Sequence, residues 1–239
     1  MGEQMKIAVI ADIIASKKMD NRARLQEVLD HILEEINTQF SNQIESNLTV
    51  TLGDEFQGII GDCYTAFLVI DLIDTKLKLE TKKQLNEEAS LRWGIGIGDI
   101  LTPIKDKTIS IGTDGPAYWN ARAAIERVHS ENDYGETTER VETNTEVGPF
   151  WNSIIKLQNT IRNDWTTTQQ ETAYTALNVF GYEEINNQRL KQQMNQSYHK
   201  SFSEQTISKR IKSTHIKQYS QSRKQLAEQI EQWRSAYDY

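Results

Sequence analysis

The sequence has little cysteine and little proline. Cys63 is its single cysteine, and its three prolines all precede residue 151. One cysteine cannot build a disulfide framework or a cysteine-cluster zinc site, and such usage is typical of a reducing cytosol. Long hydrophobic runs are also lacking: the longest near the N-terminus covers residues 7–11, whereas a signal-peptide core needs about 7–15 apolar residues and a membrane helix about 20. We therefore expect a soluble, cytoplasmic protein with no membrane partner.

Charge and composition divide the 239 residues in two. The formal net charge is −7, but residues 1–150 carry 15 basic and 26 acidic groups, whereas residues 151–239 carry 12 basic and 8 acidic groups. Eleven of the 12 glycines lie in the first part and 13 of the 19 glutamines in the second. Glycine and proline mark turn-rich sheet structure, and glutamine and lysine suit helices. We expect an acidic domain over residues 1–146 and a mildly basic, all-helical domain over residues 147–239.

Apolar periodicity predicts the elements of the first domain. Strands are expected over residues 6–12, 48–52, 56–60 and 91–97, and helices over 21–40, 64–79 and 115–128, with a hairpin at 53–55 and a polar connector over 80–89. The resulting order, β-α-β-β-α-β, is the split βαβ or ferredoxin-like pattern of an α+β (α/β) palm domain. In the second domain, helices are expected over 147–161, from 167 or 168 to 180, and over 187–194, 203–213 and 219–237.

Two aspartates are candidate metal ligands. Asp12 ends the first predicted strand, and Asp54 lies in the hairpin whose strands are expected beside it. Two carboxylates held close together repel each other unless a cation lies between them. Mg²⁺ (or Mn²⁺) fits, because it takes one or two carboxylates and completes its shell with water and phosphate oxygens. Glu55 adds a third carboxylate. The alternative is that both aspartates simply favour turns.

A phosphate-binding segment would support this metal site. Ser16, Lys17 and Lys18 follow Asp12 and precede a helix, so a hydroxyl and two ammonium groups stand where a triphosphate could lie. Loop lysines are more often merely solvated. The sequence has no Walker A motif and no Gly-x-Gly-x-x-Gly after a strand. The four histidines show no metal-ligand spacing, and Cys63 is expected to be buried in the core, where it serves packing.

The predicted helix over residues 203–213 is a candidate DNA-reading helix. Ile207 and Ile211 form an apolar anchor, and polar groups surround it. A recognition helix needs this combination of a docking stripe and a face of base- and phosphate-contacting groups. The expected contact residues are Gln205, Thr206, Lys209, Arg210 and Lys212. The alternative is a helical dimerisation or regulatory module, and the loop before this helix is longer than an ordinary helix-turn-helix turn.

Short motifs resemble the catalytic palm of class III nucleotide cyclases and, more distantly, of diguanylate cyclases. The matching segments are 11–14 (Ala-Asp-Ile-Ile), 52–56 (Leu-Gly-Asp-Glu-Phe), 92–98 (Arg-Trp-Gly-Ile-Gly-Ile-Gly) and 115–122 (Gly-Pro-Ala-Tyr-Trp-Asn-Ala-Arg). The resemblance implies that Asp12 and Asp54 hold metal ions beside a nucleoside triphosphate, and Asn120 is expected to bind the nucleotide. The whole chain is similar to the bacterial SatD family, whose members look like such a palm joined to a helix-turn-helix.

The departures from the cyclase pattern concern its cyclising groups. Val50 stands where cyclases carry a purine-selecting lysine, and Ala124 stands where their helix carries an arginine, since Arg122 and Arg127 lie off register. Leu52 replaces the second glycine of the diguanylate cyclase hairpin. The metal ligands are kept while the cyclising residues are not, a pattern that suits a nucleotide sensor or an enzyme of altered chemistry.

These observations lead to one functional hypothesis and two alternatives. We expect a bacterial cytosolic regulator that binds a nucleotide of the ATP or GTP class with Mg²⁺ and binds double-stranded DNA through a C-terminal helix-turn-helix. The first alternative is an enzyme in which Asp12, Asp54, Glu55 and Arg122 cyclise or hydrolyse a nucleoside triphosphate. The second is an interaction protein without a nucleotide. A homodimer is expected, because resembled palms pair and helix-turn-helix proteins read two half-sites.

Overall fold

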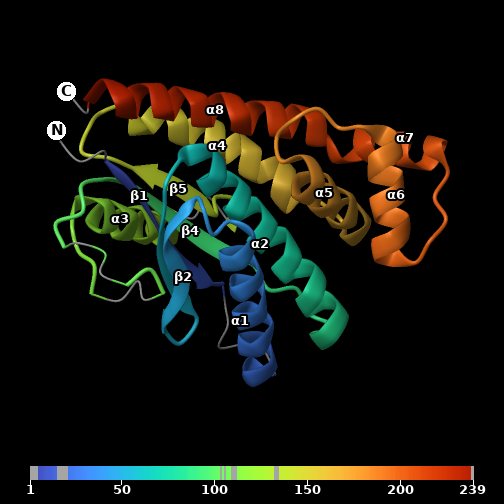
Figure 1. The fold of residues 1–239 in the computed structure, drawn as a ribbon, viewed down its shortest axis with the longest axis horizontal. Helices are drawn as coiled ribbons and strands as arrows, with labels where there is room; N and C mark the ends of the chain where they lie inside the picture. Colours follow the sequence, from blue (N-terminus) through green and yellow to red (C-terminus); the bar gives the residue numbers. More distant parts are fainter. Residues whose placement is uncertain are drawn as a thin grey trace.

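The computed structural model describes residues 5–14, 21–102, 104, 106–108, 112–131 and 135–237. Its centre is a five-stranded sheet in the order β2-β3-β1-β4-β5 (Figure 1). The strands are β1 (Lys6–Ile13), β2 (Ile44–Leu52), β3 (Glu55–Ile60), β4 (Leu91–Gly98) and β5 (Glu139–Glu142). The β1–β3, β1–β4 and β2–β3 pairs are antiparallel, and β4–β5 is parallel. The first four strands occupy the positions that the split βαβ pattern predicts.

Eight helices complete the described part of the chain. They are α1 (Arg22–Gln39), α2 (Cys63–Leu85), α3 (Pro116–Glu131), α4 (Gly148–Asn163), α5 (Thr167–Phe180), α6 (Asn187–Tyr198), α7 (Glu204–Thr214) and α8 (Ile216–Tyr237). Side-chain caps start several of them: Asn21 accepts from Arg24 N, Asp62 from Thr65 N, and Ser203 from Thr206 N. Such caps satisfy backbone donors that a helix start leaves free. The mixed α+β class is therefore confirmed.

Two expectations about the first part of the chain were wrong in detail. The polar connector expected over residues 80–89 is largely helix, because α2 continues to Leu85. Its last turns are anchored by the buried Thr81, whose hydroxyl donates to Leu77 O and accepts from Ala89 N. The strand β5 was not expected at all. Its four residues, Glu-Arg-Val-Glu, carry a single apolar side chain, which is too little to mark a strand by alternation.

The two faces of the sheet are covered differently. On one face α3 packs directly on three glycines of β4, Gly94, Gly96 and Gly98. A Cβ atom on Gly96 would lie 2.0 Å from the Ala117 carbonyl oxygen, and one on Gly94 would lie 2.2 Å from that of Ala121. Glycine is therefore required here by the close approach of helix backbone to strand backbone. The spacing of three glycines along β4 thus fixes the position of α3.

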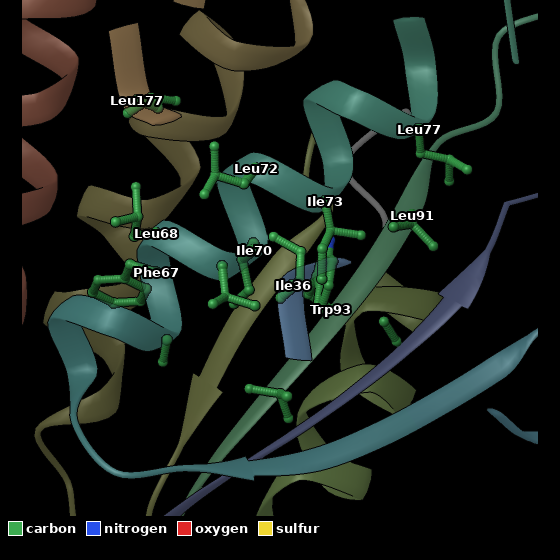
Figure 2. Close-up of a cluster of buried hydrophobic side chains, with 14 of the residues drawn as sticks. Ile36, Phe67, Leu68, Ile70, Leu72, Ile73, Leu77, Leu91, Trp93 and Leu177 are labelled. Carbon is green, nitrogen blue, oxygen red and sulfur yellow. The ribbon is translucent and has the colours of Figure 1, made fainter. Parts of the chain in front are cut away.

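On the other face, α2 is buried on both of its sides. Figure 2 shows Ile73 and Leu77 turned towards Leu91 and Trp93 of β4, whereas Leu68 and Leu72 lie towards Leu177 of α5. A helix that is apolar all round is one that lies between two layers. The helical second part of the chain supplies the outer layer, with α5 and α8 in contact with α2 and with α4 in contact with β5 (Figure 1).

The sheet and the C-terminal helices share one hydrophobic core. Trp151 and Ile155 of α4 and Leu226 and Ile230 of α8 belong to the same buried cluster as Ile7 of β1. The helix α4 begins at Gly148, beside the expected boundary at residue 147. The division into domains 1–146 and 147–239 stays a prediction. Cys63 is free and buried, as expected, and its burial raises the pKa of the thiol well above its ordinary value.

Buried charges join the same two parts of the chain. Asp71 of α2 accepts hydrogen bonds from Arg162 of α4 at 2.6 Å and from Arg223 of α8 at 2.7 Å, and both arginines also form ion pairs with Glu139 of β5. The hydroxyls of Tyr182 and Tyr219 donate to Asp71 as well. Burial alone would raise the pKa of Asp71, but the two arginines outweigh burial and hold this pKa below its ordinary value.

The described helices include none with the length and hydrophobicity that a crossing of the bilayer requires.

Candidate functional site at the edge of the sheet

Asp12 and the hairpin meet at one end of the sheet. The register pairs Asp12 of β1 with Glu55 of β3, the residue after Asp54, and on its other side with Arg92 of β4. Ala8 and Ile10 pack with the α3 residue Ala117, so alternation along β1 puts Asp12 on this same face. Two parts of the chain about 40 residues apart thus bring carboxylates to one edge.

The Glu55 carboxylate is held by an arginine. Arg122 of α3 donates to both of its oxygens, at 2.5 and 2.7 Å. These hydrogen bonds hold the pKa of Glu55 below its ordinary value, against the opposing effects of burial and of the nearby Asp54 carboxylate. The Arg122 side chain is 43% exposed and that of Glu55 is 23% exposed. Two of the four groups expected as catalytic are thus paired with each other at a solvent-accessible surface.

Asp12 is held on one oxygen only. The Nε2 of His129, in the last turn of α3, lies 2.8 Å from Asp12 Oδ2. Arg92 contacts the same imidazole, so the ring lies between an arginine and a carboxylate. Asp12 Oδ1 is buried and has no hydrogen-bond partner among the described residues. A buried oxygen of a carboxylate is costly to leave unpaired, so this atom indicates a site for a cation or a donor.

A small pocket lies beside this carboxylate. Its volume is about 220 Å³, and it is lined by Ile14, Arg92, Val128, His129, Gly135, Thr137 and Thr138. Arg92 lies 3.8 Å from Asp12 Oδ2. Arg92 and His129 thus line the pocket, and both contact Asp12. This arrangement suits an anionic group bound next to a cation.

The remaining sequence-predicted residues of this site have mixed outcomes. Asp54 is half-buried in the turn and makes no hydrogen bond or ion pair within the described ranges. Asn120 donates its side-chain amide to Ile97 O at 2.8 Å, and so fastens α3 to β4. Ser16, Lys17 and Lys18 lie outside the described residues. The structure thus brings Asp12, Asp54, Glu55 and Arg122 to one edge of the sheet, whereas the Asn120 side chain is used in a hydrogen bond between α3 and β4.

The carboxylates at this edge bear on whether a divalent cation can bind. Among the described residues no cluster of three or more His, Cys, Asp or Glu side chains forms a metal cage. Mg²⁺ does not need such a cage, because one or two carboxylates suffice when water and phosphate supply the other ligands. Glu55 is occupied by Arg122, which leaves Asp12 Oδ1 and Asp54 as the available carboxylates. These two residues fit the ion.

Sequence reasoning missed Arg92 and His129. Arg92 stands opposite Asp12 once the β1–β4 register is known, and the strand pattern alone could have found it. His129 lies 117 residues from Asp12, and only the packing of α3 on the glycines of β4 brings the two together. No sequence motif marks that contact.

The expected DNA-reading helix, α7, exposes part of its polar face. Gln205, Lys209 and Lys212 are exposed, while Ile207 and Ile211 are buried as expected. Arg210 instead turns inwards: it donates to the Thr168 carbonyl at 3.1 Å and pairs with Glu171 at 3.2 Å. The Thr206 hydroxyl is shared with Ser203 in the helix cap. Arg210 and Thr206 are therefore engaged inside the protein.

These features describe an α+β protein with a mixed-charge site at one sheet edge and a helical C-terminal region packed on the sheet. The family model of the SatD family matches residues 6–230. The chain therefore belongs to the SatD family, which confirms the resemblance that the motifs indicated.

Similar solved structures cover about half of the chain, and no curated protein matches it. An adenylate/guanylate cyclase/hydrolase from Silicibacter pomeroyi is 22% identical, with 52% of this chain and 70% of that chain covered and a TM-score of 0.39. A bacterial light-regulated adenylyl cyclase is 15% identical (58% and 75% covered, TM-score 0.39). The adenylyl cyclase CyaB from P. aeruginosa is 16% identical (55% and 74% covered, TM-score 0.36). Because these likenesses are partial, function has to be argued from the chain's own residues.

Proposed function

We propose that this SatD-family protein binds a nucleoside triphosphate of the ATP or GTP class, together with Mg²⁺ or Mn²⁺, at the sheet edge formed by Asp12 and the Gly53–Asp54 turn. The observation that carries the proposal is the buried Oδ1 of Asp12, which has no partner among the described residues and whose strand neighbour Glu55 directly follows Asp54. Two such carboxylates attract a hard cation, and a cation held by only two protein ligands takes phosphate oxygens readily. When bound, the ion supplies charge neutralisation to a polyphosphate.

The surrounding cations support a phosphate-bearing ligand. Arg92 and His129 line the 220 Å³ pocket next to Asp12, and Arg122 stands on the hairpin side with almost half of its side chain exposed. Arginine forks match the geometry of phosphate oxygens. Asp12 contacts His129 and Glu55 pairs with Arg122, so each of these two basic side chains is held in place by a carboxylate that a ligand does not need to displace.

Binding should depend on the metal and on both aspartates. Titration of the full-length protein with ATP and GTP by calorimetry should show binding in Mg²⁺ that is lost in chelator. Asp12→Asn and Asp54→Asn should weaken binding by about tenfold or more, since each removes a ligand charge. Asp30→Asn, which removes the same charge from the exposed face of α1, is the matched control and should bind as the parent does. Equal binding with and without chelator would overturn the proposal.

Turnover is the alternative at the same site. If the protein cyclises or hydrolyses the triphosphate, products should appear when it is incubated with ATP or GTP and Mg²⁺ or Mn²⁺. Their formation should stop in Asp54→Asn and persist in Asp30→Asn. Binding without products supports a nucleotide sensor, the regulatory role expected from the sequence.

A second candidate function is duplex DNA binding at α7. The observation that favours it is the exposed row of Gln205, Lys209 and Lys212 on a helix with a side-chain cap at Ser203. Binding to the protein's own promoter region should weaken steeply with salt, because phosphate contacts release counterions. Lys209→Ala with Lys212→Ala should weaken it, whereas Arg24→Ala, which removes an exposed basic residue of α1, should not. Salt-insensitive or absent binding at low ionic strength removes this candidate.

A homodimer is the proposed assembly. The apolar stripe of α8 is used internally, with Leu226 and Ile230 buried. On α4, Trp151 and Ile155 are buried, but Phe150 is 69% and Leu157 is 71% exposed. Large exposed apolar side chains on one helix are typical of an interaction surface. Light scattering should give a dimer at micromolar concentration, and Leu157→Glu should shift it to monomer without lowering thermal stability.

A further inference from the structure

A second cleft lies at the junction of the sheet-covering helix α2 with α5 and α6, and the proposed function does not use it. Its volume is about 590 Å³, within the range of small-molecule sites. The C-terminal half of α2 forms one wall, α5 forms the floor, and the end of α6 with the residues after it forms the other wall. Figure 1 shows α2, α5 and α6 in succession along one side of the molecule. The cleft therefore lies between the palm and its helical tail.

The floor and the α6 wall each carry a tyrosine with a lysine ammonium near its ring. Lys76 of α2 has its ammonium 5.8 Å from the centre of the Tyr174 ring of α5, and Lys200 has its ammonium 5.9 Å from that of Tyr198. Burial raises the pKa of Tyr174, and it raises that of Tyr198 to about 12. Both phenols therefore stay uncharged and add no negative charge against an anion. They offer aromatic surface on which a planar ring can lie.

The charge of the cleft favours an anion in a protein that is acidic as a whole. Four lysines and two glutamates line it, and one of these lysines, Lys76, is paired with Glu35 outside the lining. Glu171 is already shared between Lys200 and Arg210, and Glu80 accepts from the Gln84 amide. In the described part of the chain, Lys82 and Lys83 have no ion-pair partner. They lie in the last turn of α2, where lysine also stabilises the helix dipole.

We infer that this cleft binds a small aromatic anion, a planar ring that bears a phosphate or carboxylate group and has the size of a nucleoside monophosphate. The ring would lie against Tyr174 and Tyr198, and the anionic group would meet Lys82 and Lys83 at the open end. No cation is required, because ammonium groups rather than carboxylates face the ligand. A ligand here touches α2 of the palm and α6, which precedes α7, so it stabilises one arrangement of the tail on the palm.

The probe is AMP in the presence of EDTA, titrated by calorimetry into the full-length protein, with adenosine and inorganic phosphate as separate titrants. AMP should bind in chelator, and more tightly than either fragment, because the ring and the phosphate contribute together. Asp12→Asn should leave this binding unchanged, which separates it from the metal-dependent site. Absence of AMP binding, or binding that needs Mg²⁺ and Asp12, overturns the inference.

Matched charge reversals locate the site. Lys83→Glu should weaken AMP by about tenfold, as expected when a charged hydrogen bond is lost. Lys217→Glu makes the same change in net charge at an exposed position on α8, outside the cleft, and should have no effect. Tyr174→Leu removes one of the two aromatic rings and should weaken the binding of AMP without changing the affinity for phosphate. If Lys83→Glu and Lys217→Glu weaken AMP equally, only net charge matters and the cleft is not the site.

Discussion

Two clusters of arginine and carboxylate lie on opposite faces of the same sheet, and they differ in burial and in completeness. In the cluster around Asp71, Glu139, Arg162 and Arg223, every one of these side chains is at most 1% exposed. In the cluster around Asp12, Glu55, Arg92, Arg122 and His129, exposure runs from 20% to 47%. The inner cluster joins α2, β5, α4 and α8; the edge cluster joins β1, β3, β4 and α3.

The difference shows which charges stabilise the fold and which are available for a ligand. Buried ions must be fully paired, since each carries a large desolvation cost. Both oxygens of Asp71 accept hydrogen bonds from arginine or tyrosine. At the edge, by contrast, Asp12 Oδ1 has no partner in the described ranges although it is buried. The Asp71 carboxylate therefore has no oxygen left for a ligand, whereas the Asp12 carboxylate has one.

The strongest way to break this comparison is to remove one arginine from the inner cluster. Arg223→Leu leaves Asp71 and Glu139 with too little positive charge in the interior. We expect the free energy of unfolding to fall by about 3–5 kcal/mol, the usual cost of breaking a buried pair. Urea denaturation measures this change. A loss below about 1 kcal/mol would mean that the ion pairs of the inner cluster do not hold the helical tail on the palm.

A second substitution tests what holds the edge cluster in place. Gly96→Ala puts a Cβ 2.0 Å from the Ala117 carbonyl oxygen, so α3 has to move away from β4. We expect a loss of about 1–3 kcal/mol in unfolding free energy, and weaker nucleotide binding because α3 carries Arg122 and His129. Gly148→Ala is the control, since its Cβ would meet atoms at 3.7 Å or beyond. If Gly96→Ala matched this control in both measurements, backbone packing would not be what positions the site.

Lowering the pH should show how much the carboxylates of each cluster contribute to the free energy of unfolding. The pKa values of Asp71, Asp74 and Glu55 all lie below their ordinary values in the folded protein. A carboxyl with a lowered folded pKa adds stability above its unfolded pKa, and that stability is lost as pH falls through the folded pKa. Unfolding free energy should thus decrease below about pH 4. Glu55→Gln should keep most of this decrease, because Asp71 and Asp74 are the buried members. A flat pH profile in Glu55→Gln would contradict that assignment.

Much of the edge site could be predicted from sequence, because the split βαβ order puts the end of β1 beside the hairpin. Asp12 and Asp54 needed only strand order and turn position. His129 needed the packing of α3, which depends on backbone contacts that no side-chain pattern records. The inner cluster was missed for a different reason. Arg162, Arg223 and Arg234 were counted as part of a basic tail, but all three are buried in the fold. A charged residue at a helical position is read as exposed unless its partner is known, and Asp71 lies 152 residues from Arg223.

That miscount also bears on the DNA hypothesis. Three of the 12 basic groups after residue 150 are buried, and Arg210 is turned towards Glu171, so the basic surface of the tail is smaller than its composition indicates. The lysines of α7 remain exposed.

The smallest effect on stability is expected for Arg122→Ala at the edge. The ion pair between Arg122 and Glu55 is short and uses both carboxylate oxygens, yet the arginine is 43% exposed. Solvent-exposed pairs contribute about 0–1 kcal/mol, because water and salt screen the attraction and the free partner is rehydrated easily. We therefore expect the unfolding free energy to change by less than about 1 kcal/mol while the affinity for ATP or GTP with Mg²⁺ falls.

Urea denaturation and calorimetry on the same preparation measure these two quantities separately. Arg127→Ala is the matched control, since Arg127 is also on α3 and its side chain, which pairs with Glu142, is 54% exposed; it should change neither. A fall in stability like that of Arg223→Leu, with nucleotide affinity unchanged, would make the edge pair a structural one and remove the distinction between the two clusters.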